Sequence, residues 1–162
     1  MKLRVATPLL ALSLGLVTGR VLCQSEHSDM NSRGEHVMGF SQEQTTHHFE
    51  LTYDGGVIDV RANDVNDTAS RDEIRSHFRH IAQMFAEGNF DAPMLVHGTE
   101  IPGIATMKQR KDQLHWQYEE TPRGARLKVT ADNKASLDAL HEFLRFQIEQ
   151  HQTGDCTMVQ PD

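Results

Sequence analysis

Cysteine is scarce in this chain, which has two cysteines among 162 residues. Cys23 and Cys156 lie near opposite ends of the sequence, so there is no C-x-x-C motif and no cysteine cluster of the kind that holds structural zinc. In an exported protein, two cysteines permit one disulfide that ties the two ends together, and two unpaired thiols are the open alternative.

Long apolar runs are also absent, except for residues 5–17 near the N-terminus. This run follows the basic residues Lys2 and Arg4, and it is shorter than the ~20 residues that a membrane-spanning helix needs. Small residues come directly after it, as they do at signal-peptide cleavage sites. We therefore expect residues 1–22 to be a signal peptide and the mature chain to be periplasmic or secreted, without a transmembrane segment. Lipid anchoring through Cys23 is an alternative.

The sequence lacks the short motifs that mark common catalytic sites. It contains no G-x-S-x-G, no H-E-x-x-H, no P-loop and no C-x-x-C-H for covalent haem attachment. Glu119 and Glu120 are neighbours in an expected strand and point to opposite faces, so they do not form an acid–base pair. These absences favour a protein that is not an enzyme.

Acidic side chains outnumber basic ones by 23 to 16, which gives a formal net charge of −7 at pH 7. Residues 1–22 carry three basic side chains and no acidic one, so their removal leaves a net charge of −10. A surface this acidic argues against nucleic acid and anionic membranes as partners, and it is compatible with the collection of cations.

The chain after residue 45 begins with a pattern that predicts two strands and a helix. Apolar residues alternate with polar ones in 46–53 and in 57–62, and Asp54-Gly55-Gly56 predicts a hairpin turn in which glycine takes a positive φ. Ser70-Arg71-Asp72-Glu73 has the spacing of a capping box and predicts the start of a helix that ends near Gly88. The inward residues are Phe49, Leu51, Tyr53, Ile58, Val60 and Ala62 in the strands and Ile74, Phe78, Ile81 and Phe85 in the helix.

The C-terminal half repeats this order of elements. Thr121-Pro122-Arg123-Gly124 predicts the turn, Asp132-Asn133 caps the helix, and alignment of the two units places Ile58 over Leu127. We therefore expect an α+β fold, a pseudo-twofold ββα-ββα repeat whose single antiparallel sheet has two helices on one face. The alternative is a chance similarity of two generic hairpin–helix units. The inward residues of the second unit are Leu114, Trp116, Tyr118, Leu127, Val129, Ala131, Leu137, Leu140, Leu144 and Ile148.

The segments outside these units differ in composition. Residues 23–45 are polar and predict a flexible arm, residues 46–152 form the single domain, and residues 153–162 form a polar tail. Within the domain, residues 89–110 predict a linker with proline and glycine, and a loop of this length is often functional. The arm carries His27, Met30, His36 and Met38.

Ten histidines and seven methionines in an acidic exported chain indicate a transition-metal site. Imidazole and thioether donors together suit copper. The pattern His77-x-x-His80-x-x-x-Met84 places three such donors along one edge of the expected helix. The alternative is that His77 and Met84 are boundary residues of the core and that His80 is solvated.

Further metal ligands are expected from the linker and from the first strand. Met94 and His97 lie in the linker, and His47 shares the inward parity of Phe49. His141 lies on the apolar stripe of the second helix and is predicted to be a core residue. The six predicted ligands are His47, His77, His80, Met84, Met94 and His97.

Three functions fit these features. The first is an exported metal-binding protein that sequesters or delivers copper. The second is a small module in which the open face of the sheet or the linker holds a periplasmic protein partner or an organic ligand. The third is a non-covalent haem protein with histidine and methionine as axial ligands.

Three segments resemble a family of small exported bacterial proteins without an established activity. They are MGFSQEQTTHHF at residues 38–49, IRSHFRHI at residues 74–81 and HEFLRFQI at residues 141–148. The resemblance covers residues 36–155 and implies export and a single domain. It implies no chemistry, because the chain has neither the Ser-Thr-Arg-Thr phosphate loop nor the length of the aspartate carbamoyltransferases whose name such sequences sometimes carry.

Overall fold

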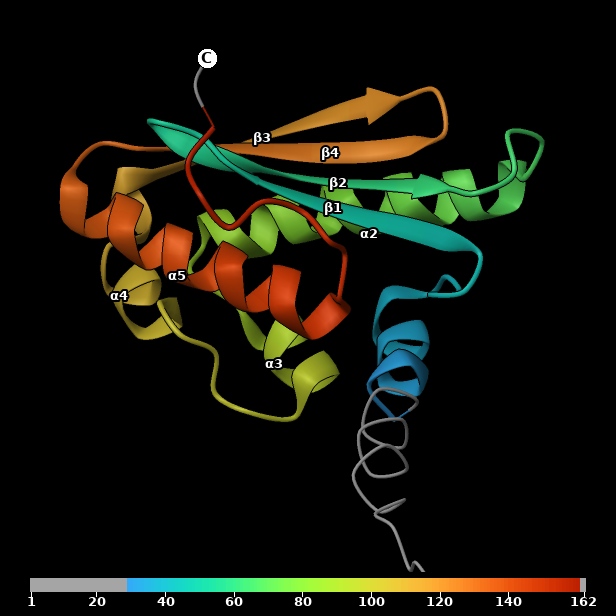
Figure 1. Ribbon diagram of the computed structural model, residues 1–162, viewed down its shortest axis with the longest axis horizontal. Helices are drawn as coiled ribbons and strands as arrows, with labels where there is room; N and C mark the ends of the chain where they lie inside the picture. Colours follow the sequence, from blue (N-terminus) through green and yellow to red (C-terminus); the bar gives the residue numbers. More distant parts are fainter. Residues whose placement is uncertain (1–28, 161–162) are drawn as a thin grey trace, which may run out of the picture.

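The computed structural model describes residues 29–160, so that the predicted signal peptide lies outside the described part of the chain. Residues 29–38 form a helix, called here the N-terminal helix. The elements that follow are β1 (Thr45–Leu51), β2 (Gly55–Ala62), α2 (Thr68–Ala86), α3 (Asp91–His97), α4 (Ile104–Gln109), the 3-10 helix η1 (Lys111–Gln113), β3 (Leu114–Thr121), β4 (Gly124–Ala131) and α5 (Lys134–His151) (Figure 1).

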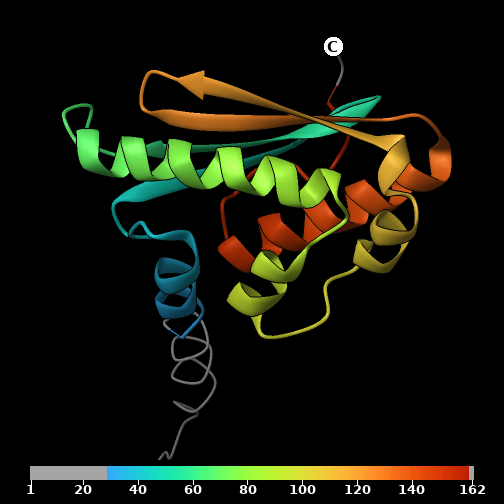
Figure 2. The same ribbon diagram turned by 180° about the vertical axis from the view of Figure 1, so that it is seen from behind.

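The strands form one antiparallel sheet in the order β1-β2-β4-β3. Both long helices, α2 and α5, lie beneath the same face of this sheet (Figures 1 and 2). Helix α2 packs mainly under β4 and β3, whereas α5 packs mainly under β1 and β2. The predicted α+β class and the single antiparallel sheet with two helices on one face are therefore confirmed.

Strand alternation places the core residues where the sequence predicts them. Phe49 pairs with Ile58, Ile58 with Leu127, and Tyr118 with Leu127, so these side chains share the face that the helices cover. Phe49, Ile58 and Leu127 are buried. Tyr53 is different, because β1 ends two residues earlier and its side chain, predicted to point inward, is 77% exposed in the connecting turn.

Gly55 and Gly56 begin β2, and the turn before it is formed by residues 52–54. Neither glycine has a positive φ, so the predicted reason for their presence is wrong. A Cβ on Gly55 would lie 1.8 Å from the carbonyl oxygen of Val129, and one on Gly56 would lie 2.3 Å from Cδ1 of Leu144. Glycine is required here because a neighbouring strand and a helix approach the backbone closely.

Helix α2 is capped by Asp67, whose carboxylate accepts a hydrogen bond from the backbone N–H of Ser70 at 3.0 Å. The predicted capping box of Ser70 and Glu73 is wrong, because aspartate also serves as an N-cap and starts the helix one turn earlier. The four residues of the predicted apolar stripe are buried. Asn133 caps α5 as predicted, and it accepts from the backbone N–H of Ser136 at 3.1 Å.

Two segments predicted to be irregular contain helices. The N-terminal helix occupies part of the arm predicted for residues 23–45. Its Met30 is only 5% exposed, and Phe40, which follows the helix, is only 2% exposed. The linker predicted for residues 89–110 holds α3 and α4, and its Met107 is fully buried. The arm is polar and the linker contains proline and glycine, but apolar side chains of both segments have places in the core, and their burial stabilises short helices.

The C-terminal segment, residues 152–160, runs along the free edge of β1 (Figure 1). The carboxylate of Asp155 accepts a hydrogen bond from the backbone N–H of Phe49 at 2.9 Å. The backbone N–H of Gln160 donates to the carbonyl oxygen of Leu51 at 2.8 Å. This segment therefore satisfies edge groups of β1 that would otherwise be open to pairing with another chain.

Cys156 lies in the C-terminal segment with its side chain exposed. Its predicted partner Cys23 lies outside the described residues, so the disulfide stays a prediction, as do the signal peptide and the lipid anchor. Within residues 29–160, no helix has both the length and the apolar character that a membrane span requires.

Candidate functional site

A cavity of about 80 Å³, called here the histidine cavity, lies between the sheet and the helices. Residues from β1, β2 and β4 form its wall on one side, and residues from α2, α3 and α5 form it on the other. Apolar side chains such as Phe49, Phe78 and Phe143 make up most of this wall. The cavity is therefore an opening in the main core beside the predicted linker.

Four histidines from four different elements border the histidine cavity. They are His47 in β1, His77 in α2, His97 in α3 and His151 at the end of α5. The ring centres of His47 and His151 are 5.0 Å apart, and those of His97 and His151 are 5.1 Å apart. The ring of His77 packs edge-on against Phe40 at 5.7 Å. The fold thus brings together imidazoles that are far apart in the sequence.

Burial keeps two of these imidazoles neutral at pH 7. Burial lowers the pKa of His47 to about 4, with smaller contributions from the neighbouring His77 and His48. Burial likewise lowers the pKa of His77 to about 4, and His80 adds to this effect. A neutral imidazole has one N–H donor and one acceptor nitrogen, so each ring has both kinds of polar group at the cavity wall.

His97 and Gln147 leave two buried polar atoms without a partner. Nε2 of His97 lies 3.0 Å from Oε1 of Gln147. The remaining polar atom of each side chain, Nδ1 of His97 and Nε2 of Gln147, is buried and has no hydrogen-bond partner. Burial lowers the pKa of His97, although the bond to Gln147 acts in the opposite direction. Both residues border the histidine cavity, and Gln147 is 4% exposed.

Charged side chains are absent from the wall. Among the described residues, no Asp, Glu, Lys or Arg side chain lines the histidine cavity. The polar groups of the wall are the four imidazoles and the amide of Gln147. A charged group inside this cavity would therefore lose its water without gaining an opposite charge.

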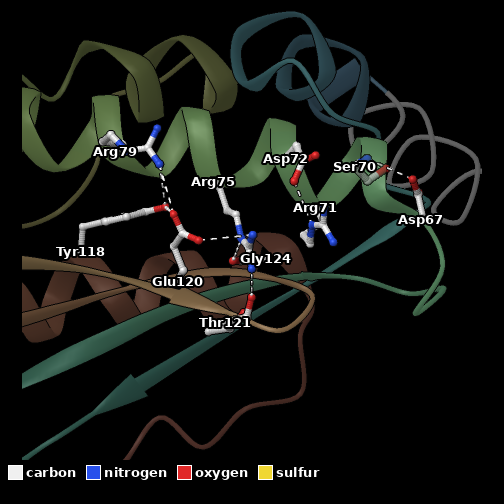
Figure 3. A network of polar contacts seen from close by, with 10 residues as sticks. All are labelled: Asp67, Ser70, Arg71, Asp72, Arg75, Arg79, Tyr118, Glu120, Thr121 and Gly124. Carbon is white, nitrogen blue, oxygen red and sulfur yellow. Dashed lines mark hydrogen bonds and ion pairs between the residues drawn. The ribbon is translucent and has the colours of Figure 1, made fainter.

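A network of polar contacts joins α2 to the β3–β4 hairpin (Figure 3). Nη2 of Arg75 donates to the carbonyl oxygen of Thr121 at 2.6 Å, and Nε donates to that of Gly124 at 3.1 Å. Arg75 also forms an ion pair with Glu120 at 3.2 Å. These bonds tie α2 to the β3–β4 hairpin two residues before His77.

Of the six predicted metal ligands, His47, His77 and His97 border the histidine cavity, and the other three lie elsewhere. His80 is exposed, because it lies on the solvent side of α2. Met84 follows His77 by seven residues, which separates them by about 10.5 Å along the helix axis. Met84 and Met94 are half-buried against the core and do not line the histidine cavity. The six predicted residues therefore do not form one site.

Sequence reasoning missed Gln147 and His151, which line the histidine cavity together with Met38, a residue noted only as part of the predicted arm. Gln147 and His151 follow Leu140 and Leu144 at spacings of three and four residues, so the apolar stripe of α5 continues into the cavity. That continuation was a usable signal in the sequence. Met38 could not be found in this way, because it belongs to the segment predicted to be a flexible arm.

The described residues contain no ready metal centre. Within residues 29–160, no group of three His, Cys, Asp or Glu side chains is arranged to hold a metal ion. The rings of His47 and His151 are stacked with 11° between their planes, so lone pairs in these planes do not converge. Outside the cavity, His141 is a core residue as predicted, and its Nε2 lies 2.9 Å from the carbonyl oxygen of Gly55.

Comparison of the chain with family models, with curated proteins and with solved structures gave no match. The function is therefore inferred from the geometry and chemistry of the histidine cavity.

Proposed function

We propose that this protein binds a small uncharged molecule in the histidine cavity, with a hydroxyl group held between His97 and Gln147. The observation that carries the proposal is the pair of unpartnered buried atoms, Nδ1 of His97 and Nε2 of Gln147, at the wall of an apolar cavity. Nearly all buried polar groups in folded proteins have a hydrogen-bond partner, and each one without a partner costs about 1–3 kcal/mol. A ligand that satisfies both atoms recovers this cost.

A hydroxyl group matches the two atoms because it both donates and accepts. When Nε2 of His97 carries the proton and donates to Gln147, Nδ1 is an acceptor and the amide nitrogen is a donor. Reversal of the amide and of the imidazole tautomer exchanges the two roles, and one donor and one acceptor again remain. The proposed preference for a hydroxyl does not depend on this assignment.

The size of the histidine cavity favours a short alkyl group beside the hydroxyl. The cavity measures about 80 Å³, whereas an apolar cavity of roughly 150 Å³ holds benzene. The walls are apolar and carry no charged side chain, so a carboxylate or an ammonium group would pay a desolvation cost that no ion pair offsets. The expected ligand is therefore neutral.

Titration of the ¹⁵N-labelled protein with 1-butanol tests the proposal by NMR. We expect a Kd in the millimolar range, as befits a ligand of five heavy atoms, with the largest shifts at the side-chain amide of Gln147 and the ring of His97. Butyrate and butylammonium have the same chain with a charged head, and we expect both to bind at least tenfold more weakly.

A cavity-filling variant supplies the matched control. Ala92→Leu adds three carbons at the cavity wall and should abolish 1-butanol binding, whereas Ala86→Leu on the exposed side of α2 should not change it. Equal binding of the alcohol and the two ions, or unchanged binding by Ala92→Leu, contradicts the proposal.

A second candidate function is copper binding at the same imidazoles. Ring nitrogens at the usual 2.0–2.1 Å from one ion would put two ring centres about 5 Å apart, and the pairs His47–His151 and His97–His151 have centres 5.0 and 5.1 Å apart. Met38 at the wall adds a thioether, which suits Cu(I). Rotation of the His47 or His151 ring would be needed to direct the nitrogens toward one point.

Metal titration of chelator-treated, untagged protein tests this second candidate. One equivalent of Cu(I) should bind, and His151→Ala should weaken it at least tenfold, whereas His80→Ala should have no effect because that ring is exposed away from the cavity. Absence of binding by both Cu(I) and Cu(II), or equal losses in the two variants, would rule out a copper site here.

The pseudo-twofold ββα-ββα repeat is also proposed, and the strand register supports it. A shift of 69 residues carries the pair Phe49↔Ile58 of β1–β2 onto the pair Tyr118↔Leu127 of β3–β4. Ile58 pairs with Leu127, which is its own equivalent, across the centre of the sheet. Each helix packs mainly under the strands of the other unit. The histidine cavity obeys no such symmetry, because α3 lies between the units.

A further inference from the structure

A second hollow, called here the polar hollow, adjoins the histidine cavity and shares His47 and His151 with it. Its volume is about 250 Å³. Apart from the two shared imidazoles, its lining consists of amide and hydroxyl side chains, namely Asn31, Gln42, Thr45, Thr46, Gln152 and Thr153. The stacked pair of His47 and His151 therefore stands between an apolar chamber and a polar one.

One further contact and one backbone feature lie where these chambers meet. Nε2 of Gln42, at the polar hollow, lies 3.7 Å from the sulfur of Met38, which lines the histidine cavity. Gln152 directly follows His151 and has a φ of 51°, and within residues 29–160 it is the one non-glycine residue with a positive φ. The backbone at the shared wall is thus held in a conformation that residues other than glycine rarely adopt.

The polar hollow resembles the histidine cavity in one respect, because no charged side chain among the described residues lines it either. The two hollows together have roughly the volume of a site for a small organic molecule, which is usually 300 Å³ or more. One is apolar and the other carries donors and acceptors without charge. The chemistry of the whole site therefore changes from apolar to polar at the two imidazoles.

We infer that the two hollows form one elongated site for an uncharged amphipathic molecule. Its alkyl end occupies the histidine cavity, and its polar end, a chain of hydroxyl or ether oxygens, occupies the polar hollow. His47 and His151 lie at the boundary, where their rings contact the ligand on both sides. This inference rests on the proposed function for the alkyl end and extends it to the class of molecule that is bound.

The probe that separates the two claims is 1-(2-hydroxyethoxy)pentan-2-ol, which keeps the carbon chain and the hydroxyl group of 1-butanol and adds an ether and a second hydroxyl group on the carbon that bears the first. We expect it to bind at least tenfold more tightly than 1-butanol in the NMR titration, with added shifts at Asn31 and Gln42. Asn31→Leu replaces an amide at the polar hollow and should remove most of the gain while the Kd of 1-butanol stays the same. Ser32→Leu on the exposed side of the N-terminal helix is the matched control and should retain the gain.

Three outcomes decide the inference. If 1-butanol binds and the longer molecule binds no better, the polar hollow is not part of the site and the inference fails while the proposed function stands. If the gain survives Asn31→Leu, the polar end lies elsewhere and the inference also fails. If neither molecule binds, the proposed function itself fails, and this inference fails with it.

Discussion

Individual side chains in this protein take their properties from burial more than from neighbouring charges. His47 and His77 lie among apolar groups, and burial is the main reason that the pKa of each is about 4. Buried imidazoles that stay neutral are useful at a binding site, because they offer a donor and an acceptor without attracting ions. Their cost appears in the dependence of folding stability on pH.

The free energy of unfolding should fall as the pH is lowered from 6.5 toward 4. A histidine in the unfolded chain has a pKa of about 6.5 and gains its proton first, so protons favour the unfolded state throughout this range. At pH 5 one such histidine accounts for a loss of about 2 kcal/mol relative to pH 7. Both rings are mostly neutral in the folded protein at pH 5, so the losses from His47 and His77 nearly add. Urea denaturation at both pH values measures the loss.

Variants at one helix separate this effect from other titrations. His77→Leu should reduce the loss between pH 7 and pH 5, whereas His80→Ala should retain it because that ring is solvent-exposed. Asp67 and Asp155 have pKa values lowered from 3.8, so they affect stability only at more acidic pH. A loss of the same size in His77→Leu would show that the buried imidazoles are not its origin.

Gly55→Ala should destabilise the protein by more than about 3 kcal/mol or prevent folding. The new Cβ would meet the backbone of β4 at 1.8 Å from the carbonyl oxygen of Val129, and paired strands cannot separate without breaking their ladder. Gly34→Ala is the control, because its Cβ would meet only the flexible ends of Gln42 and Met38 in a helix that favours alanine. Thermal unfolding should show this difference, and equal effects would contradict the close-approach argument.

Elements whose apolar residues recur at a regular spacing were predictable from the sequence. Elements that form only by packing against segments far away in the sequence were not. The stripe of Ile74, Phe78, Ile81 and Phe85 fixed α2 and its buried face, because a period of 3.6 residues has one structural solution. The N-terminal helix has few apolar residues, and α3, with seven residues, is too short to show a period. They form because single side chains such as Phe40 find places in a core built by other elements.

The orientation of α2 should depend on Arg75, whose guanidinium caps two carbonyl groups of the β3–β4 turn. Arg75→Gln should lower the free energy of unfolding by about 2 kcal/mol, because both hydrogen bonds involve a charged donor. Arg71→Gln should leave it nearly unchanged, since Arg71 pairs with the exposed Asp72 on the surface. Chemical denaturation compares the two, and equal losses would contradict the role given to Arg75.

At the scale of the whole molecule, the site is made by tertiary structure. His47 was predictable as an inward residue, His77 as an edge residue of its helix and His97 as a ligand from the linker. Spacing along one helix also selected His80 and Met84, which lie elsewhere. The proposed function depends most on His97 in α3 and Gln147 in α5. These two residues are 50 positions apart in the sequence and share no local pattern. Such a pair emerges only when the helices are packed.

A crystal structure of the protein soaked in 1-butanol tests the central claim most directly. We predict that the butyl chain lies in the histidine cavity and that its oxygen lies about 2.7–3.0 Å from both Nδ1 of His97 and Nε2 of Gln147. Alcohol density located only on the protein surface, or a chain in the cavity with its oxygen bonded to neither atom, would contradict the account.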